Sequence, residues 1–350
     1  MSEIAIVGAG MMGSALCWPL SDNRQSIRLV GTFLDEDIIR SCQTTGIHPK
    51  LQRHLPQRVV PYSYTQMKEA LTGVDFIVSG VSSFGVDWFA RTTGPFLQPE
   101  IPVIAVTKGL EDQPDGDLQI LPVATNNRLP DEKKDKISLN AIGGPCIAHE
   151  LAARRQTAVV FCGQDYRVLE KLRGIFAADY YHIRLSTDVT GVEVCAALKN
   201  AYAMGVSLAM GMMDRSGADG LANMYNPQAA LFGQSCLEMR RLLEITQGGV
   251  ENVSWLPGAG DLFVTVFGGR TMRLGRLLGQ GFSFKEAREQ LAGETMESVE
   301  IITRVARALP KLAARGVTRL EYFPLLLHLD QIINHGQVVN IPWSKFYLDA

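Results

Sequence analysis

Residues 3–18, EIAIVGAGMMGSALCW, decide the first half of the fold. Glu3–Val7 is a short apolar run typical of a buried strand, and it leads directly into GAGMMG at residues 8–13, the pattern G-x-G-x-x-G. The next residues predict a helix that Pro19 breaks. A strand, a glycine turn and a helix in this order predict the start of a dinucleotide-binding unit. The alternative is a glycine turn that binds nothing.

Each glycine of this turn has an expected role. Gly8 permits the tight turn, Gly10 lets a pyrophosphate approach the backbone, and Gly13 lets the helix pack close to the strand. The start of the helix offers backbone N–H groups to the phosphates. We therefore expect NAD or NADP as the cofactor.

The preference between these two cofactors stays open. The second strand is expected at Ile27–Val30, and an NAD site usually has an acidic residue where this strand ends. Thr32 stands there, and Asp35, Glu36 and Asp37 come slightly late. These acids are equally explained as the first turn of the next helix, where negative charge favours the helix dipole.

The remaining strands of the first half alternate with helical stretches. This alternation predicts an α/β fold, a doubly wound parallel sheet of the Rossmann type, over residues 1–188. The further strands are expected at Val59–Tyr62, Asp75–Val81, Pro102–Thr107, Ile137–Ile142, Thr157–Cys162 and Tyr180–Leu185, with a helix at Thr65–Leu71.

Candidate ligand-binding residues follow these strands, because ligands of such sheets bind beyond the carboxyl ends of the strands. Lys108 follows one strand and is expected to meet the substrate, although a surface lysine is the alternative. The glycine pair at residues 143–144 predicts a loop whose backbone N–H groups could touch a ligand. His149 suggests a general base, but no Ser or Asp lies at triad spacing, so a structural or solvent role is favoured.

The second half is organised around residues 191–213, GVEVCAALKNAYAMGVSLAMGMM. Its length suits a membrane span, but Lys199 near the middle would be costly there. We therefore predict no stable membrane insertion and a helix buried on all sides, at the centre of an all-helical domain over residues 189–350. A buried lysine is rare unless it is paired or functional; the alternative is that Lys199 extends its head to the surface.

Further helices are expected at Gln228–Thr246, Ser283–Ala292, Met296–Leu309 and Phe323–Asn334. A loop is expected at residues 256–262, and glycines flank both Asp261 and Arg270. Because its guanidinium is planar and permanently charged, Arg270 is suited to a phosphate. Arg273 and Arg276 are equally explained as a solvated helix face.

Composition narrows the function classes. The net charge of -2 gives no basic face for nucleic acid. The six cysteines are scattered, without C-x-x-C, which favours reduced thiols and no metal site. The first residues lack a basic segment before a long apolar core, so we expect no signal peptide and a cytoplasmic location.

Seven motifs occur in order along the chain: GAGMMG, TKG, GGPCIA, GVEVCAALKN, GAGDL, GGR and ETMESVE. From end to end the sequence resembles the NAD(P)-dependent glycerol-3-phosphate dehydrogenases. The resemblance implies an oxidoreductase that interconverts dihydroxyacetone phosphate and sn-glycerol 3-phosphate by hydride transfer and supplies a glycerophospholipid precursor. Its partner would be a small phosphorylated polyol. The apolar helical domain favours a homodimer, although the sequence leaves the oligomeric state open.

The resemblance also assigns roles to residues. Lys199 is implied as the catalytic acid/base, with Lys108 and Asp261 in the same active site. The implied cofactor-binding residues are Gly8, Gly10, Met11, Met12, Gly13, Thr32, Phe84, Lys108, Ala148, Arg270 and Glu297. The implied substrate-binding residues are Lys108, Gly144, Cys146, Lys199, Asn200, Asp261, Thr265, Gly269, Arg270 and Thr271.

Three positions depart from the family pattern. Cys146 stands where serine is common, Thr271 where asparagine helps to hold the substrate phosphate, and Ser298 follows Glu297 where glycine is usual. These departures leave two alternatives: the same chemistry on another phosphorylated or acidic polyol, and a sensor or scaffold that binds the dinucleotide without turnover. The presence of Lys108, Lys199 and Asp261 argues against the second.

Overall fold

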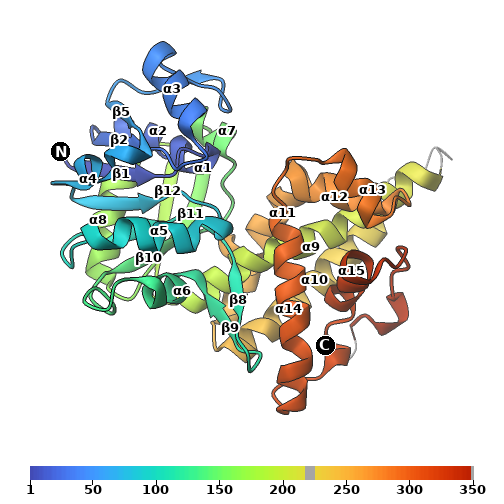
Figure 1. Ribbon diagram of the computed structural model, residues 1–350. Coiled ribbons are helices and arrows are strands. Elements are labelled where there is room, and N and C mark those ends of the chain that lie inside the picture. Colours follow the sequence, from blue (N-terminus) through green and yellow to red (C-terminus); the bar gives the residue numbers. More distant parts are fainter. Residues whose placement is uncertain (217–224, 348–350) are drawn as a thin grey trace. The chain divides into compact units, whose positions relative to one another are not determined.

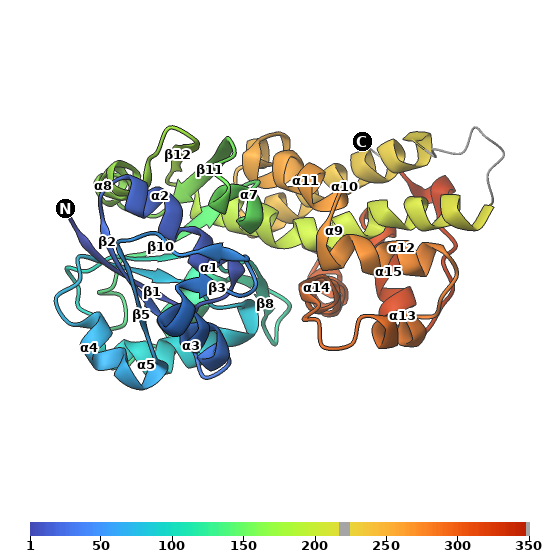
Figure 2. The same cartoon turned by 90° about the horizontal axis from the view of Figure 1, so that it is seen from above.

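A computed structural model describes residues 1–216 and 225–347 of the chain. The chain divides into two compact units (Figures 1 and 2). The first comprises residues 1–108 and 121–189, and the second comprises residues 109–120 and 190–350. The segment 109–120 thus belongs to the second unit, which the expected boundary after residue 188 did not anticipate.

The first unit is built on one eight-stranded sheet of order β12-β11-β10-β7-β6-β1-β2-β5. Neighbouring strands are parallel except for the antiparallel pair β10 and β11. The strands are β1 Glu3–Val7, β2 Ser26–Val30, β5 Val59–Tyr62, β6 Phe76–Ser79, β7 Val103–Ala105, β10 Leu139–Gly143, β11 Thr157–Cys162 and β12 Tyr181–Ser186.

Helices cover both faces of this sheet. Along β1, Ile4 and Ile6 enter the core on one face, whereas Ala5 and Val7 enter the core on the other. The helices that pack into the first core are α1 Met11–Ala15, α2 Cys17–Asp22, α3 Glu36–Thr45, α7 Ala148–Ala152 and α8 Tyr166–Phe176. Those that pack into the second core are α4 Met67–Leu71 and α5 Val86–Thr93. Helix α6 Leu121–Arg128 packs on α5. The predicted doubly wound, Rossmann-type fold is confirmed.

The first helix breaks earlier than expected. The sequence predicted the break at Pro19, but α1 ends at Ala15 and Pro19 lies inside α2. Proline has no N–H to donate to the carbonyl four residues before it, which is that of Ala15. The interruption therefore falls one turn ahead of the proline.

Two small hairpins complete the strands. One pairs β3 Ile47–His48 with β4 Arg53–His54, and the other pairs β8 Leu110–Asp112 with β9 Leu118–Ile120. Neither was predicted, because strands of two or three residues carry little periodicity.

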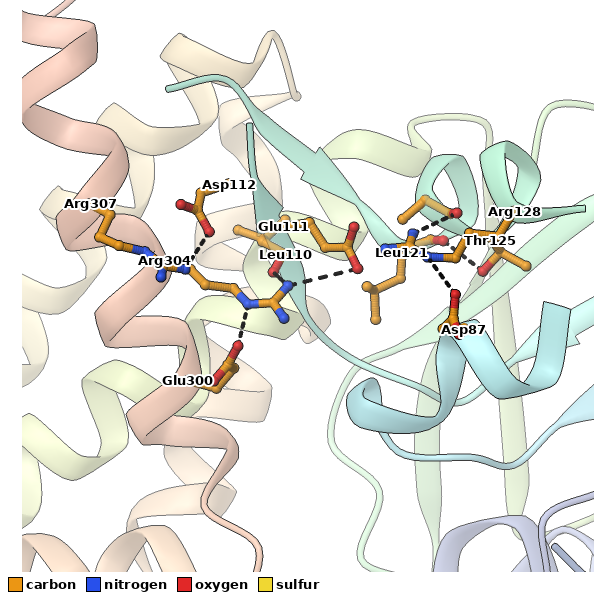
Figure 3. A network of polar contacts seen from close by, with 11 residues as sticks. Asp87, Leu110, Glu111, Asp112, Leu121, Thr125, Arg128, Glu300, Arg304 and Arg307 are labelled. Atoms are coloured by element: carbon orange, nitrogen blue, oxygen red, sulfur yellow. Dashed lines mark hydrogen bonds and ion pairs between the residues drawn. The ribbon is translucent and has the colours of Figure 1, made fainter. Parts of the chain in front are cut away.

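The second hairpin is bound to helix α14 Glu297–Ala314 by a row of arginines (Figure 3). Arg304 donates to the carbonyl of Leu110 at 2.7 Å and pairs with Glu300 at 2.5 Å. Arg307 pairs with Asp112 at 2.8 Å. Further along the helix, Arg315 pairs with Asp117 at 2.7 Å. This contact explains why residues 109–120 belong to the helical unit.

In its described residues, 109–120, 190–216 and 225–347, the second unit is helical apart from this hairpin. Its helices are α9 Val189–Ser216, α10 Tyr225–Thr246, α11 Asp261–Val266, α12 Gly269–Gly279, α13 Phe284–Gln290, α14 and α15 Pro324–His335. The predicted helical C-terminal domain is confirmed.

Short 3-10 turns occur in both units. They lie at Tyr64–Gln66, Ser83–Gly85, Gly94–Phe96, Val250–Ser254, Leu320–Tyr322 and Trp343–Lys345. Within residues 1–216 and 225–347, no helix combines the length and apolarity that crossing a membrane requires.

Helix α9 lies against α12 at very short distance. A Cβ atom added at Gly275 would lie 2.4 Å from the carbonyl oxygen of Met204, and one at Gly279 would lie 2.1 Å from that of Leu208. No side chain fits at these positions, so the glycines let the two backbones approach. Because α12 begins at Gly269, this packing fixes Arg270 relative to the helix that carries Lys199.

The stretch predicted as a loop at residues 256–262 is instead helical. Leu256–Gly260 forms one π-helical turn, and α11 begins at Asp261. Pro257 stands at the start of this turn, where its missing N–H costs nothing. Glycine and proline therefore mark the start of a helix here, where the sequence analysis expected a loop.

Candidate functional site

In the glycine turn after β1, two glycines are required by the packing of the protein itself, and the third has free space beside it. Gly8 has φ +111°, and a Cβ atom added there would lie 2.7 Å from the carbonyl carbon of Gly80. At Gly13 an added Cβ atom would lie 2.5 Å from the oxygen of Gly8. At Gly10 it would meet no atom closer than 4.0 Å. The space beside Gly10 is therefore open to a ligand, as a pyrophosphate requires.

The first acid after β2, Asp35, is engaged by hydrogen bonds within the protein. Thr32 is buried, and both its N–H and its hydroxyl donate to Oδ2 of Asp35, at 2.9 and 2.8 Å. Glu36 and Asp37 lie in the first turn of α3. A hollow of about 230 Å³ adjoins Thr32, and its lining includes one acid, Glu36, and one positive charge, Arg40.

Lys108 lies where the sequence predicted, just beyond β7. Its ammonium donates to the carbonyl of Gly144 at 3.2 Å, and the preceding Thr107 donates to the carbonyl of Val81 at 2.7 Å. Two strand ends of the first unit are thus tied together, with the loop after β10 joined to them. Cys146 follows in that loop and is half-buried.

The other residues expected in the first unit differ in exposure. Met11 and Phe84 are exposed, and Met12 and Ala148 pack partly against the core. His149 is exposed on α7.

Lys199 of α9 forms an ion pair with Asp261, the first residue of α11. The aspartate side chain is fully buried, and that of the lysine is 13% exposed. An ion pair compensates a buried carboxylate for its lost hydration, and Asp261 has such a partner although 62 residues separate the two in sequence. The ammonium is thus held in one direction, and part of the lysine side chain remains accessible.

Two further expected residues of the helical unit bind within one short segment, residues 295–297. Asn200, next to Lys199 in sequence, donates to the carboxylate of Glu297 at 3.4 Å. Arg270, at the start of α12, donates to the hydroxyl of Thr295 at 2.8 Å. Thr295 lies two residues before Glu297, so the motifs GGR and ETMESVE meet.

The neighbours of Arg270 have structural partners. Arg273 pairs with Glu294 at 2.6 Å, and Arg276 binds Asp214 through two nitrogens at 2.5 and 2.9 Å. The hydroxyl of Thr265 donates to the backbone oxygen of Asp261 at 2.6 Å. Gly269 has φ +84°, and Thr271 is half-buried behind it.

No cluster of three or more His, Cys, Asp or Glu side chains that could hold a metal ion is found within the part of the chain that the structure describes.

Two side chains contact the glycine turn in a way that the sequence does not predict. Asp35 accepts from the N–H of Ala9 at 3.1 Å, and His48 lies 3.0 Å from the carbonyl oxygen of Ala9. The sequence suggests Asp35 as a late acid after the second strand or as an acid of the next helix, and it does not single out His48. A polar side chain within 20 residues after the second strand is the signal that could have found them.

A sheet of this order with a glycine turn after its first strand is typical of dinucleotide-binding proteins. Joined to a helical unit that carries a buried lysine, it defines the class of two-domain NAD(P)-dependent oxidoreductases.

Comparisons with known proteins specify the family. Residues 3–168 match the model of the NAD-dependent glycerol-3-phosphate dehydrogenase N-terminus, and residues 188–342 match that of its C-terminus. The chain belongs to this family, so the resemblance seen in the sequence is confirmed.

Individual proteins that the chain is similar to carry the name of the same family. The NADP(+)-dependent glycerol-3-phosphate dehydrogenase of Archaeoglobus fulgidus is 34% identical over 85% of this chain and 86% of its own length. The glycerol-3-phosphate dehydrogenase [NAD(P)+] of Shouchella clausii is 31% identical over 91% of this chain and 93% of its own. The crystal structure of glycerol-3-phosphate dehydrogenase from Coxiella burnetii superposes with a TM-score of 0.79 at 25% identity, covering 98% and 97% of the two chains.

Proposed function

We propose that this protein interconverts dihydroxyacetone phosphate and sn-glycerol 3-phosphate with NAD(P)H. The observation that carries the proposal is the buried Lys199–Asp261 ion pair in a chain of this family. Structural ion pairs are also buried in proteins, but this lysine keeps part of its side chain accessible.

The glycine turn fits the proposed cofactor. The open space beside Gly10 admits a pyrophosphate, and Gly8, Met11, Met12 and Gly13 complete the turn. Thr32, Phe84, Lys108, Ala148, Arg270 and Glu297 are the other residues that we propose to contact the dinucleotide. When bound, NAD(P)H supplies a hydride to the carbonyl carbon of the substrate.

Lys199 is proposed as the acid/base. As the carbonyl becomes an alcohol, its oxygen gains negative charge, and a positive donor beside it lowers the barrier. The ammonium of Lys199 can polarise that oxygen and then transfer its proton to it. Asp261 holds the ammonium in position and compensates its charge. In the reverse direction the neutral amine takes the proton back.

The substrate phosphate is proposed to bind Arg270 and Thr271. Arginine offers two parallel N–H groups to a phosphate, and a threonine hydroxyl can donate a third bond. Lys108, Gly144, Cys146, Asn200, Thr265 and Gly269 are proposed as further substrate-binding residues. Because Thr271 replaces the usual asparagine, another phosphorylated or acidic polyol is the second candidate substrate.

The test is the initial rate of NADH and NADPH oxidation with dihydroxyacetone phosphate, run beside unphosphorylated dihydroxyacetone. Turnover with the phosphate ester alone supports both the reaction and an anion site that includes Arg270. The ratio of the two cofactor rates gives the cofactor preference. If the protein binds cofactor but turns over neither compound, the substrate assignment is wrong, and other polyol phosphates are then profiled.

Four further expectations belong to this proposal. The physiological product is a precursor of glycerophospholipids, and the active form is a homodimer. The six cysteines, none of which forms a disulfide, suit a reducing compartment such as the cytoplasm. Residues 1–188 and 189–350 are the two proposed domains.

A further inference from the structure

Ala9 of the glycine turn lies between two peptide groups, Gly8–Ala9 and Ala9–Gly10, and each is held by a side chain from outside the turn. Its N–H donates to Oδ2 of Asp35 at 3.1 Å, and its carbonyl oxygen lies 3.0 Å from Nε2 of His48. Ala9, Asp35 and His48 are all buried. These bonds are therefore shielded from water, and each holds one of the two peptide groups in one orientation.

Asp35 is used in an unusual way. It stands at the N-cap of α3, where an aspartate normally bonds the backbone N–H groups of its own helix. Here it makes no such cap bond, and Oδ2 instead accepts from Ala9 and from both donors of Thr32. Losing the cap costs the helix about 1 kcal/mol. The carboxylate is thus directed to the turn at the expense of its own helix.

The partners of His48 define its protonation state. A carbonyl oxygen can only accept, so Nε2 carries the hydrogen that binds Ala9. The other nitrogen, Nδ1, accepts from the N–H of Leu51 at 3.1 Å. Burial lowers the pKa of His48, which keeps the ring neutral in this tautomer. The β3–β4 hairpin, where His48 ends β3, fixes the ring in place.

The orientation of Ala9 determines where the next N–H points. The carbonyl of Ala9 and the N–H of Gly10 belong to one planar trans peptide, so they point in opposite directions. Because His48 holds this carbonyl, the Gly10 N–H is directed away from His48. Gly10 is also the position where an added Cβ atom meets nothing closer than 4.0 Å.

We propose that His48 and Asp35 are positioning residues for the cofactor: His48 orients the Ala9–Gly10 peptide so that the Gly10 N–H faces the pyrophosphate, and Asp35 holds the preceding Gly8–Ala9 peptide in place. The inference rests on the proposed function, because it requires that the glycine turn binds NAD(P)H. It assigns to the hairpin that contains His48 a role in affinity, although neither side chain touches the cofactor.

Two substitutions of His48 separate the two bonds that the ring makes. In His48→Gln the amide nitrogen reaches the place of Nε2 and keeps the bond to Ala9, while the bond to Leu51 is lost. In His48→Asn the shorter side chain keeps an acceptor for Leu51 but cannot reach Ala9. Both variants remove the ring, so each controls for the packing change in the other.

The experiment titrates NADH and NADPH against the wild-type protein and both variants, with cofactor fluorescence as the readout. We expect the Kd of H48N to rise about tenfold, the value of one positioned hydrogen bond, and that of H48Q to stay within about twofold. When the cofactor concentration is varied in steady-state assays, the KM for the cofactor should rise in H48N, whereas kcat at saturating cofactor should change much less. Equal affinities in all three proteins, or equal losses in both variants, would overturn the inference.

Asp35→Ser provides a second test if H48N does not fold. Serine can cap α3 but is too short to reach Ala9. We expect the Kd to rise about tenfold or more while the thermal midpoint hardly falls. An unchanged Kd contradicts the role of Asp35. Wild-type protein that binds neither NADH nor NADPH refutes the proposed function itself; wild-type binding with unaffected variants refutes only the positioning role.

Discussion

Asp261 and Glu238, two buried carboxylates of the helical unit, differ in their partners. Asp261 pairs with the ammonium of Lys199. Glu238, on α10, accepts hydrogen bonds from neutral donors: the N–H groups of Leu325 and Leu326 at 2.7 and 3.0 Å, Gln234 at 2.8 Å and Tyr202 at 3.1 Å. Leu325 and Leu326 lie in the first turn of α15, so Glu238 caps that helix from another one.

The difference in partners bears on the pKa of Glu238. Burial raises the pKa of Glu238 to about 7, although all four hydrogen bonds oppose that shift. Neutral donors therefore compensate the lost hydration only in part. The comparison teaches that hydrogen bonds from neutral groups are enough to keep a carboxyl group buried where its role is structural. Asp261, in contrast, is paired with a charged side chain, the ammonium of Lys199.

The largest effect is expected at Lys199. Lys199→Arg keeps a positive partner for Asp261, but a guanidinium does not release its proton near neutral pH. Turnover with dihydroxyacetone phosphate should fall roughly 10²–10⁴-fold, with little change in cofactor Kd or thermal midpoint. Lys199→Ala should lose as much activity and also stability, since Asp261 is left buried without its ion-pair partner. Near-normal turnover in either variant would mean that Lys199 is not the acid/base.

A smaller effect is expected at Asp261. Asp261→Asn preserves the size of the side chain but removes the charge that directs the ammonium. Misplacing a catalytic group by about 1 Å can cost about 10²-fold, so we expect kcat to fall by up to that factor while the cofactor Kd holds. Steady-state kinetics at saturating cofactor measure the change. A loss that equals or exceeds that of Lys199→Ala contradicts a purely orienting role.

The smallest effect is a pH dependence of stability at Glu238. Because its pKa rises from about 4.5 to about 7 on folding, the folded state binds more protons between these values. The contribution of Glu238 to the free energy of unfolding is therefore complete below about pH 4.5 and is lost as the pH rises towards 7.

Glu238→Gln imitates the protonated acid and does not titrate. Urea unfolding at several pH values should show the wild type losing stability relative to this variant between about pH 4.5 and 7, by at most about 1.4 kcal/mol per pH unit. Above that range the difference should be constant. A difference that does not vary with pH contradicts the raised pKa.

The sequence predicts best where the determining contacts are local. The glycine turn depends on residues within one strand–turn–helix segment, and Gly8 and Gly13 have the packing roles expected of them. The bounds of the sheet strands agree with the expected ones to within two residues, because buried parallel strands are continuous apolar runs. The pairing of Lys199 with Asp261 came from the family resemblance.

What the sequence could not show depends on distant contacts. Glu238 looks like any acid on a helix until α15 packs on it, about 87 residues later. The β8–β9 hairpin depends on arginines of α14 that lie nearly 200 residues further along the chain. At residues 256–262 the composition was misleading, because glycine and proline there begin a helix.

The hairpin that Arg304 binds has a consequence for recombination. The chain passes from the first unit to the second at Lys108, returns at Leu121, and passes over again after Val189. A chimera of two relatives joined only at residue 189 would combine the hairpin of one parent with the α14 arginines of the other. Exchange of the helical unit should therefore include residues 109–120, so that Glu111 and Asp112 travel with their own arginines.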